Sequence, residues 1–180
     1  MLASMWEKTL KKSKILFRVN ASNFIGTGHI RRCITIAKAA RKLNVVPFFV
    51  INKNKSNHKY LLNDEKIHFY EIEEQLDLEN DSKETLKIVQ NLNPDILVID
   101  SYAIESKWER YVYTNSNLKL VVIDDLANRK HYCDLLIDQS FLREKIDYIP
   151  LMEKDAQIFC GSEYAMLREE FSKARAISLK

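Results

Sequence analysis

The sequence predicts an α/β protein with a mainly parallel sheet and helices on both faces. Short apolar runs recur along the chain, and amphipathic helical patterns separate them. The runs are rich in Val, Ile, Leu and Phe without strict alternation, as in strands that are buried on both faces. Strands that alternate with helices imply right-handed crossovers, so the pattern indicates a Rossmann-like layer.

Seven runs are the expected strands. In chain order they are KILFRV (14–19), VVPFFVI (45–51), KIHFYEI (66–72), DILVID (95–100), LKLVVID (118–124), DLLID (134–138) and a weaker QIFC (157–160). Three helices are expected between them, with apolar faces formed by Ile30, Cys33, Ile34, Ala37, Ala40 and Leu43, by Leu86, Val89 and Leu92, and by Trp108 and Val112. We expect residues 1–13 to be a flexible leader and residues 14–180 to form one domain.

Composition narrows the class of protein. The 180 residues suffice for one domain with a real core, and 46% hydrophobic with 29% charged residues is typical of a soluble fold. A net charge of +3 gives no indication of nucleic-acid binding. Cys33, Cys133 and Cys160 are too few and too scattered for a disulfide framework or a zinc site. No apolar run approaches the ~20 residues of a membrane span, so we expect a cytoplasmic protein with no membrane partner.

Four of the expected strands end on a polar residue: Asn20, Asp100, Asp124 and Asp138. Each one alone fits a helix cap or the start of a turn. Together they predict a polar rim at the carboxyl edge of the sheet, where ligands of such sheets bind.

The stretch IGTGHIRR (25–32) follows the first strand and opens the first helix. Gly26 and Gly28 allow a turn with positive φ or the close approach of a ligand to the backbone. The start of a helix also offers unpaired N–H groups and a partial positive charge to an anion. The third glycine of a dinucleotide fingerprint is absent, because Arg31 stands there.

His29 is the candidate catalytic residue of this stretch. The helix dipole disfavours an imidazolium at this end, and a neutral imidazole can accept a proton as a general base. A histidine that only caps the helix is the alternative. Arg31 and Arg32 stand unfavourably against the dipole, at ~0.3–1 kcal/mol each, which a nearby carboxylate or a bound anion would offset. Arg32 shares the helix face of His29, whereas Arg31 more simply faces solvent.

Four ordered blocks resemble a known family: FRVNASNFIGTGHIRRCITIAKAA, LVIDSYAIESKWER, LVVIDDLANRKHYCDLLIDQS and GSEYAMLREEF. They are similar to blocks of the bacterial UDP-2,4-diacetamido-2,4,6-trideoxy-β-L-altropyranose hydrolases of pseudaminic acid biosynthesis, relatives of spore-coat polysaccharide proteins and, more distantly, of the glycosyltransferase that makes lipid II. The resemblance runs from about Lys14 to Phe171. It implies the N-terminal half of a GT-B fold, in which two Rossmann-like domains enclose a cleft.

The resemblance also implies roles for single residues. His29 matches the histidine that the family uses as general base to activate water at the anomeric carbon, and Tyr102 matches a tyrosine of the sugar site. Gly26 and Gly28 match the glycines of the turn. Asn20, Arg32, Asp100 and Asp124 are further candidates for substrate binding.

Three features depart from the family pattern. Asn20 stands where the family usually has an aspartate, and Arg31 stands where an apolar residue is more common. The third departure is length, because family members continue into a second domain that holds the uridine diphosphate. We therefore expect a UDP-sugar substrate and a C-terminal nucleotide-binding domain as partner, in cis or in trans, and no activity of the chain alone.

Three functions remain open from the sequence. The first is half of a UDP-sugar hydrolase, the second is half of a GT-B glycosyltransferase with an acceptor hydroxyl in place of water, and the third is a non-catalytic sugar-binding or interaction module. No cofactor or metal is expected, because the adjacent Asp124 and Asp125 lack the D-x-D spacing of metal-dependent transferases. We expect His58, His68 and His131 to lie on the surface or in turns.

Overall fold

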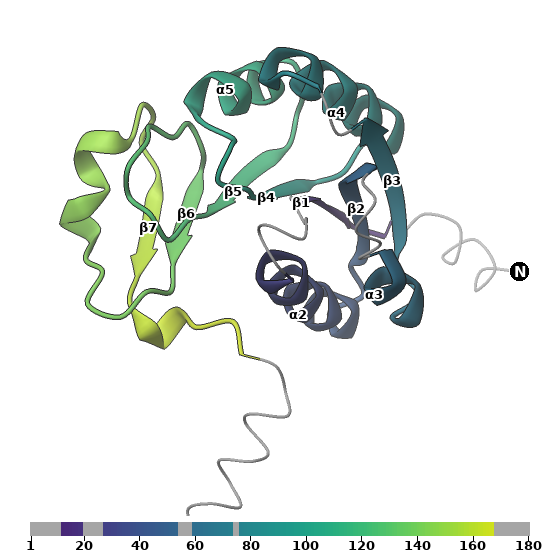
Figure 1. The fold of residues 1–180 in the computed structure, drawn as a ribbon, viewed down its shortest axis with the longest axis horizontal. Helices are drawn as coiled ribbons and strands as arrows, with labels where there is room; N and C mark the ends of the chain where they lie inside the picture. The colour runs from purple at the N-terminus through teal and green to yellow at the C-terminus, as the bar shows by residue number, and fades with distance from the viewer. Residues whose placement is uncertain (1–11, 20–26, 54–58, 74–75, 168–180) are drawn as a thin grey trace, which may run out of the picture.

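Seven parallel strands form one sheet in the order β3-β2-β1-β4-β5-β6-β7, which confirms the predicted fold class (Figure 1). The computed structural model describes residues 12–19, 27–53, 59–73 and 76–167. The strands are β1 (Lys14–Val19), β2 (Val46–Lys53), β3 (His68–Glu73), β4 (Ile96–Asp100), β5 (Lys119–Ile123), β6 (Leu135–Asp138) and β7 (Gln157–Cys160). Every run that the sequence predicts as a strand forms one, including the weak run at 157–160.

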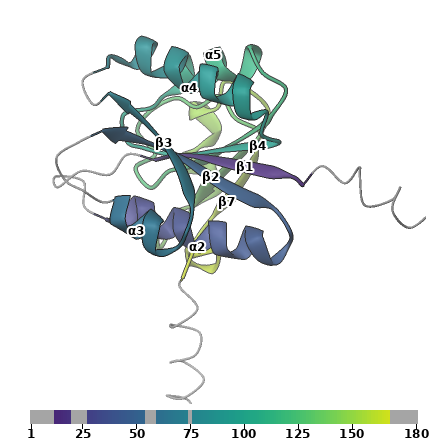
Figure 2. The same ribbon diagram turned by 90° about the vertical axis from the view of Figure 1, so that its right-hand side faces the viewer.

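Helices cover both faces of the sheet. The α-helices are α2 (Gly28–Lys42), α3 (Lys59–Asp64), α4 (Leu78–Leu92) and α5 (Ser106–Thr114), and the 3₁₀ helices are η1 (Lys145–Asp147), η2 (Ile149–Leu151) and η3 (Ser162–Tyr164). Figure 2 shows α2 and α3 on one face and α4 and α5 on the other. The sequence did not predict α3, because six residues are too few to display a helical period.

The core is divided into two apolar layers by the sheet. Alternate residues of β1 show the division, because Phe17 packs in the layer under α2 whereas Leu16 packs in the layer under α4 and α5. Most of the predicted apolar face of α2 lies in the first layer, with Ile30, Cys33 and Ala37 fully buried. The prediction is wrong for Leu43, which is 78% exposed just beyond the end of the helix. The helix thus begins at the carboxyl end of β1 with one face fixed against the sheet.

A buried ion pair ties β1 to α4. Arg18 of β1 is 2% exposed, and its Nη2 lies 2.5 Å from Oδ2 of Asp81. Asn52 of β2 accepts a second hydrogen bond from Nη2 at 2.9 Å, and the indole N–H of Trp108 donates to Asp81 Oδ1 at 2.9 Å. Asp81 therefore accepts hydrogen bonds from both a buried guanidinium and a buried indole N–H.

Replacing Asp81 with alanine should lower the free energy of unfolding by about 3–5 kcal/mol, because it leaves the buried charge of Arg18 without a partner. Asp64→Ala, at an exposed position of α3, is the matched control and should stay within about 0.5 kcal/mol. Urea denaturation measures both values. A loss for Asp81→Ala no larger than that of the control would contradict the assignment.

The three cysteines are free thiols. Cys33 and Cys133 are buried free thiols and Cys160 is a half-buried one. Burial raises the pKa of the Cys160 thiol to about 11 and that of Cys33 well above its ordinary value. None of the helices that the structure describes has the length and apolar character needed to cross a membrane.

Candidate active site

His29 lies in the first turn of α2, at the carboxyl edge of the sheet. Its Nδ1 is in direct hydrogen-bond contact with Oδ1 of Asp100, the last residue of the adjacent central strand β4. The residue is only 5% exposed, and its ring packs edge-on against the ring of Tyr102, with 4.5 Å between the ring centroids. The sequence separates His29 from Asp100 by 71 positions, and the β1–β4 pairing brings them together.

Arg32 clamps the Asp100 carboxylate from the next turn of α2. Its Nε lies 2.5 Å from Oδ2 and its Nη2 lies 2.5 Å from Oδ1, a two-pronged pair that fits the planar geometry of both groups. Burial alone would raise the pKa of Asp100, but the hydrogen bonds from Arg32 and His29 outweigh it and hold that pKa below its ordinary value. Asp100 is therefore a buried carboxylate that keeps its charge.

The contacts of Asp100 determine how the imidazole of His29 is oriented. A carboxylate accepts hydrogen bonds and donates none, so the proton between the two groups belongs to Nδ1 of His29. The Arg32 guanidinium also lies 3.3 Å from Nδ1, but both of these nitrogens carry their hydrogens toward Asp100. In the neutral ring this arrangement leaves the lone pair on Nε2, the nitrogen that a general base needs.

Tyr102 is the solvent-accessible member of this group. It is 40% exposed, two residues beyond the end of β4. Partial burial, followed by the neighbouring carboxylate of Asp125, raises the pKa of its phenol above the ordinary value. Asp125 also accepts a hydrogen bond from Nη1 of Arg32 at 3.1 Å. Because Tyr102 covers His29 and faces solvent, it is placed where a ligand would meet the site first.

The structure describes some of the other candidates near the glycine turn and not others. Asn20 and Gly26 lie outside the described residues, so their predicted roles stay predictions. Gly28 is the first residue of α2, and a Cβ built on it would meet no described heavy atom within 4 Å. Its φ is not positive, so a left-handed turn does not explain the glycine, and the close approach of a ligand stays a prediction. The guanidinium of Arg31 donates to the hydroxyl of Thr27 at 3.2 Å, and the residue is exposed, as expected.

The described strand-end aspartates lie at the predicted edge of the sheet, where they are buried and paired with arginines. Asp100, Asp124 and Asp138 are all fully buried. Asp124 accepts from Nη1 of Arg129 at 2.7 Å, and Asp138 accepts from Nε of Arg143 at 2.8 Å. Three buried aspartates, each paired with an arginine, thus underlie this edge: Arg32 comes from α2, Arg129 from the loop after β5 and Arg143 from the loop after β6.

Asp124 does not join His29. Its two oxygens are taken by Arg129, by the backbone N–H of Ala127 at 2.9 Å and by the hydroxyl of Tyr148 at 2.8 Å. These contacts position the loop after β5, which the capping alternative predicted. The proposed contact of Asp124 with substrate remains a prediction, and the geometry favours a supporting role through the loop.

The expectation that His131 lies on the surface or in a turn is wrong. His131 is fully buried, and its Nδ1 lies 2.8 Å from Oε1 of the equally buried Glu109 of α5. Its Nε2 lies 3.8 Å from Asp124. No local pattern in the sequence indicates this, because the partners Glu109 and Asp124 come from two other segments of the chain. His68 is exposed, as expected, and His58 lies outside the described residues.

The His131 network predicts a loss of stability at alkaline pH. Burial lowers the pKa of His131, but Asp124 and Glu109 outweigh burial and the nearby Arg129 and raise it to about 9. The stabilisation is complete below the ordinary value of 6.5 and is lost as the pH rises through 9. We expect the free energy of unfolding to fall by on the order of 3 kcal/mol over this window. Urea denaturation from pH 6 to 9 tests this, and a His131→Gln variant that kept the same dependence would contradict it.

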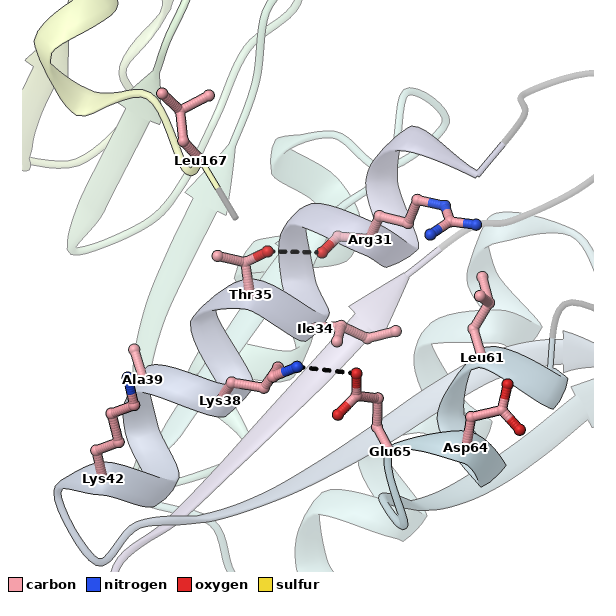
Figure 3. A pocket seen from close by; sticks show the side chains of 10 residues that line it. All are labelled: Arg31, Ile34, Thr35, Lys38, Ala39, Lys42, Leu61, Asp64, Glu65 and Leu167. Carbon is pink, nitrogen blue, oxygen red and sulfur yellow. Dashed lines mark hydrogen bonds and ion pairs between the residues drawn. The ribbon is translucent and has the colours of Figure 1, made fainter. Parts of the chain in front are cut away.

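A hollow of the surface lies away from these residues. It has a volume of about 330 Å³ and lies along the outer side of α2, between that helix, α3 and Leu167 (Figure 3). Its charged groups include an ion pair of Lys38 with Glu65 at 2.9 Å. Of the site candidates that the structure describes, Arg31 alone lines this hollow. Within the described part of the chain, no group of three or more His, Cys, Asp or Glu is placed to hold a metal ion.

Comparison with known proteins supports the resemblance in sequence. The chain is 28% identical over 158 residues to the UDP-2,4-diacetamido-2,4,6-trideoxy-beta-L-altropyranose hydrolase of Campylobacter jejuni, covering 88% of this chain and 53% of that protein. It is 26% identical over 166 residues to an uncharacterized protein of Methanocaldococcus jannaschii, covering 90% of this chain and 32% of that one. No family model matches. The chain spans about half the length of the hydrolase that it matches and a smaller share of the archaeal protein.

Solved structures support the fold. MurG of Acinetobacter baumannii superposes with a TM-score of 0.57 at 9% identity, covering 81% of this chain and 44% of MurG. A glycosyltransferase from Rickettsia africae superposes with a TM-score of 0.53 at 21% identity, covering 72% of this chain and 37% of that protein. The chain is therefore similar in sequence to about half of a UDP-sugar hydrolase, which confirms the resemblance inferred from its sequence blocks, and similar in fold to part of MurG and of the Rickettsia glycosyltransferase.

Proposed function

We propose that this chain is the base-bearing half of a nucleotide-sugar hydrolase that acts on a UDP-linked, pseudaminic-acid-type sugar. The observation that carries the proposal is the His29–Asp100–Arg32 chain, which holds an imidazole at the carboxyl edge of a parallel sheet with Nδ1 committed to a buried carboxylate. Similarity to the Campylobacter hydrolase supports this choice of reaction. Ligand binding at this edge of such sheets supports the choice of site.

The proposed reaction needs only positioning and one proton transfer from this half. Nε2 of His29 takes a proton from water, the water oxygen bonds to the anomeric carbon, and the bond from that carbon to the diphosphate breaks, so that UDP leaves with the bonding pair. Asp100 supports the positive charge that His29 gains, and the proton then passes to solvent. General base catalysis of this kind contributes about 10²–10⁴-fold. Tyr102 and the backbone at Gly28 contact the sugar, and a second half holds UDP.

The fold supports a second candidate. The Rickettsia protein, which shares this fold, is described as a glycosyltransferase. If this chain were half of such an enzyme, the same base would deprotonate an acceptor hydroxyl in place of water. The two reactions differ in their products, since hydrolysis gives a free sugar and transfer gives a glycoside. A non-catalytic sugar-binding module is the third possibility, and it releases no UDP at all.

A coupled assay of UDP release separates these functions. It compares two preparations, the gene product purified from its own organism and the isolated 180-residue chain. Each is supplied with UDP-2,4-diacetamido-2,4,6-trideoxy-β-L-altrose. We expect acceptor-independent release by the gene product and negligible release by the isolated chain, where the leaving diphosphate faces solvent. Release that requires an acceptor would favour the transferase, and its absence in every preparation would favour the module. Robust hydrolysis by the isolated chain would refute the need for a second half.

A further inference from the structure

The turn after β6 presents two adjacent apolar side chains to solvent. Phe141 is 79% exposed and Leu142 is 80% exposed, and we call this pair the apolar turn. Single exposed apolar residues are common on protein surfaces and need no explanation. Two neighbours that are almost fully exposed are a different case, particularly at the carboxyl edge of the sheet that also bears His29 and Tyr102.

The apolar turn is held in place by buried groups. Asp138 at the end of β6 accepts hydrogen bonds from the backbone N–H of Ser140 at 2.7 Å, from Nε of Arg143 at 2.8 Å and from the hydroxyl of Tyr148 at 2.8 Å. The N–H of Arg143 closes the turn onto the carbonyl of Ser140 at 3.3 Å. The fully buried carboxylate of Asp138 therefore fixes both flanks of the exposed pair.

Backbone strain accompanies this anchoring. Leu142 adopts a φ of 62°, in the left-handed region that is unfavourable for a residue with a branched side chain such as leucine. The fold thus maintains an unfavourable backbone conformation that displays a leucine to water. Such strain persists only where surrounding contacts determine it, and it concentrates at functional positions.

The apolar turn is also coupled to the candidate site. Arg143, on its far flank, donates from Nη2 to the backbone carbonyl of Asp125 at 3.2 Å. Asp125 in turn accepts from Arg32, the residue that clamps Asp100. The backbone at Met166 also lies beside the turn, because its N–H donates a hydrogen bond to the side chain of Gln139 at 2.9 Å. The turn, the site and the chain around residue 166 are therefore joined by direct hydrogen bonds.

We propose that the apolar turn is the docking point for a second α/β half, which receives Phe141 and Leu142 in an apolar recess and brings a diphosphate-binding site over His29. The inference rests on the proposed function. A second α/β half is the proposed occupant for two reasons. The chain spans 53% of the hydrolase that it resembles, and the turn lies beside both the site and the backbone at Met166. Two side chains bury too little area to hold separate proteins together unaided, which suits a contact between halves of one enzyme.

Site-specific photo-crosslinking tests the docking. A benzophenone amino acid replaces Phe141 in the gene product as its own organism makes it, and the matched control carries it at Leu43, which is 78% exposed at the opposite end of α2. We expect position 141 to crosslink to a nucleotide-binding α/β half, in the same polypeptide or a separate one, and position 43 not to. Crosslinks to a second copy of this chain, equal yields at both positions, or no crosslink at position 141 would overturn the proposal.

Variants of the same turn supply a second readout. Phe141→Ser with Leu142→Ser should lower UDP release at least tenfold in the gene product and leave the melting temperature of the isolated chain unchanged, whereas Leu43→Ser should change neither. The two failures are distinguishable. Crosslinking without any UDP release would sink the hydrolase assignment and leave the docking intact, whereas release unaffected by the double variant would sink the docking and leave the hydrolase assignment intact.

Discussion

Replacing His29 with alanine should lower UDP release by the gene product about 10²–10⁴-fold, the usual contribution of a positioned general base. The loss should fall on kcat more than on KM, because the imidazole acts in the transition state and little sugar binding depends on it. His29→Gln is the more informative variant. Glutamine can still donate to Asp100 and fill much of the same volume, but it cannot take a proton from water near neutral pH.

Two controls separate chemistry from folding in this experiment. His68→Ala removes the same side chain from an exposed position of β3 and should leave kcat unchanged. Thermal unfolding of the isolated His29→Gln chain should stay close to that of the wild type. A His29→Gln enzyme that is well folded and retains most of its activity would show that another group activates the water.

The Asp100→Asn variant should be the most damaging conservative substitution in the chain. The clamp of Arg32 loses its principal counter-charge, and breaking a buried pair by removing one partner costs about 3–5 kcal/mol. Because the folded-state pKa of Asp100 is lowered, its stabilising effect is present above the ordinary value of 3.8 and is lost as the pH falls below it. The asparagine variant should therefore also lack this part of the acid-induced loss of stability.

Activity should fall together with stability in Asp100→Asn, since an amide at this position no longer fixes the proton on Nδ1 of His29. In a well-studied catalytic triad the equivalent change lowers kcat about 10⁴-fold. Asp64→Asn makes the same chemical change at an exposed position of α3 and should alter the unfolding free energy by no more than about 0.5 kcal/mol. Full activity in a folded Asp100→Asn enzyme would contradict a positioning role for Asp100.

The sequence was sufficient to predict the sheet and the edge at which the candidate residues lie. All seven strands form where apolar runs occur, because strands buried on both faces leave a composition signal that does not depend on distant partners. The sequence placed His29 and Arg32 at the start of the first helix and Asp100 and Tyr102 at or just beyond the end of a strand. Their contact depends on β1 and β4 being neighbours in the sheet, which only the structure shows.

The sequence could not predict which side chains from distant segments pair with one another. Arg129 and Arg143 look like surface residues of loops until the structure places them on Asp124 and Asp138. His131 gives no local sign that Glu109 lies beside it, 22 positions earlier. The apolar turn escaped notice because Phe141 and Leu142 resemble core residues, and only their exposure distinguishes them. In each case the missing information is three-dimensional.

The most direct test of His29 as a poised base is the location of its ring proton. Long-range ¹H–¹⁵N NMR of the isolated chain near neutral pH, with signals assigned by comparison with His29→Gln, reports which ring nitrogen carries hydrogen. We expect the proton on Nδ1, facing Asp100, and an unprotonated Nε2. A proton found on Nε2 instead would leave no lone pair to receive one from water, and the general-base assignment would then be wrong.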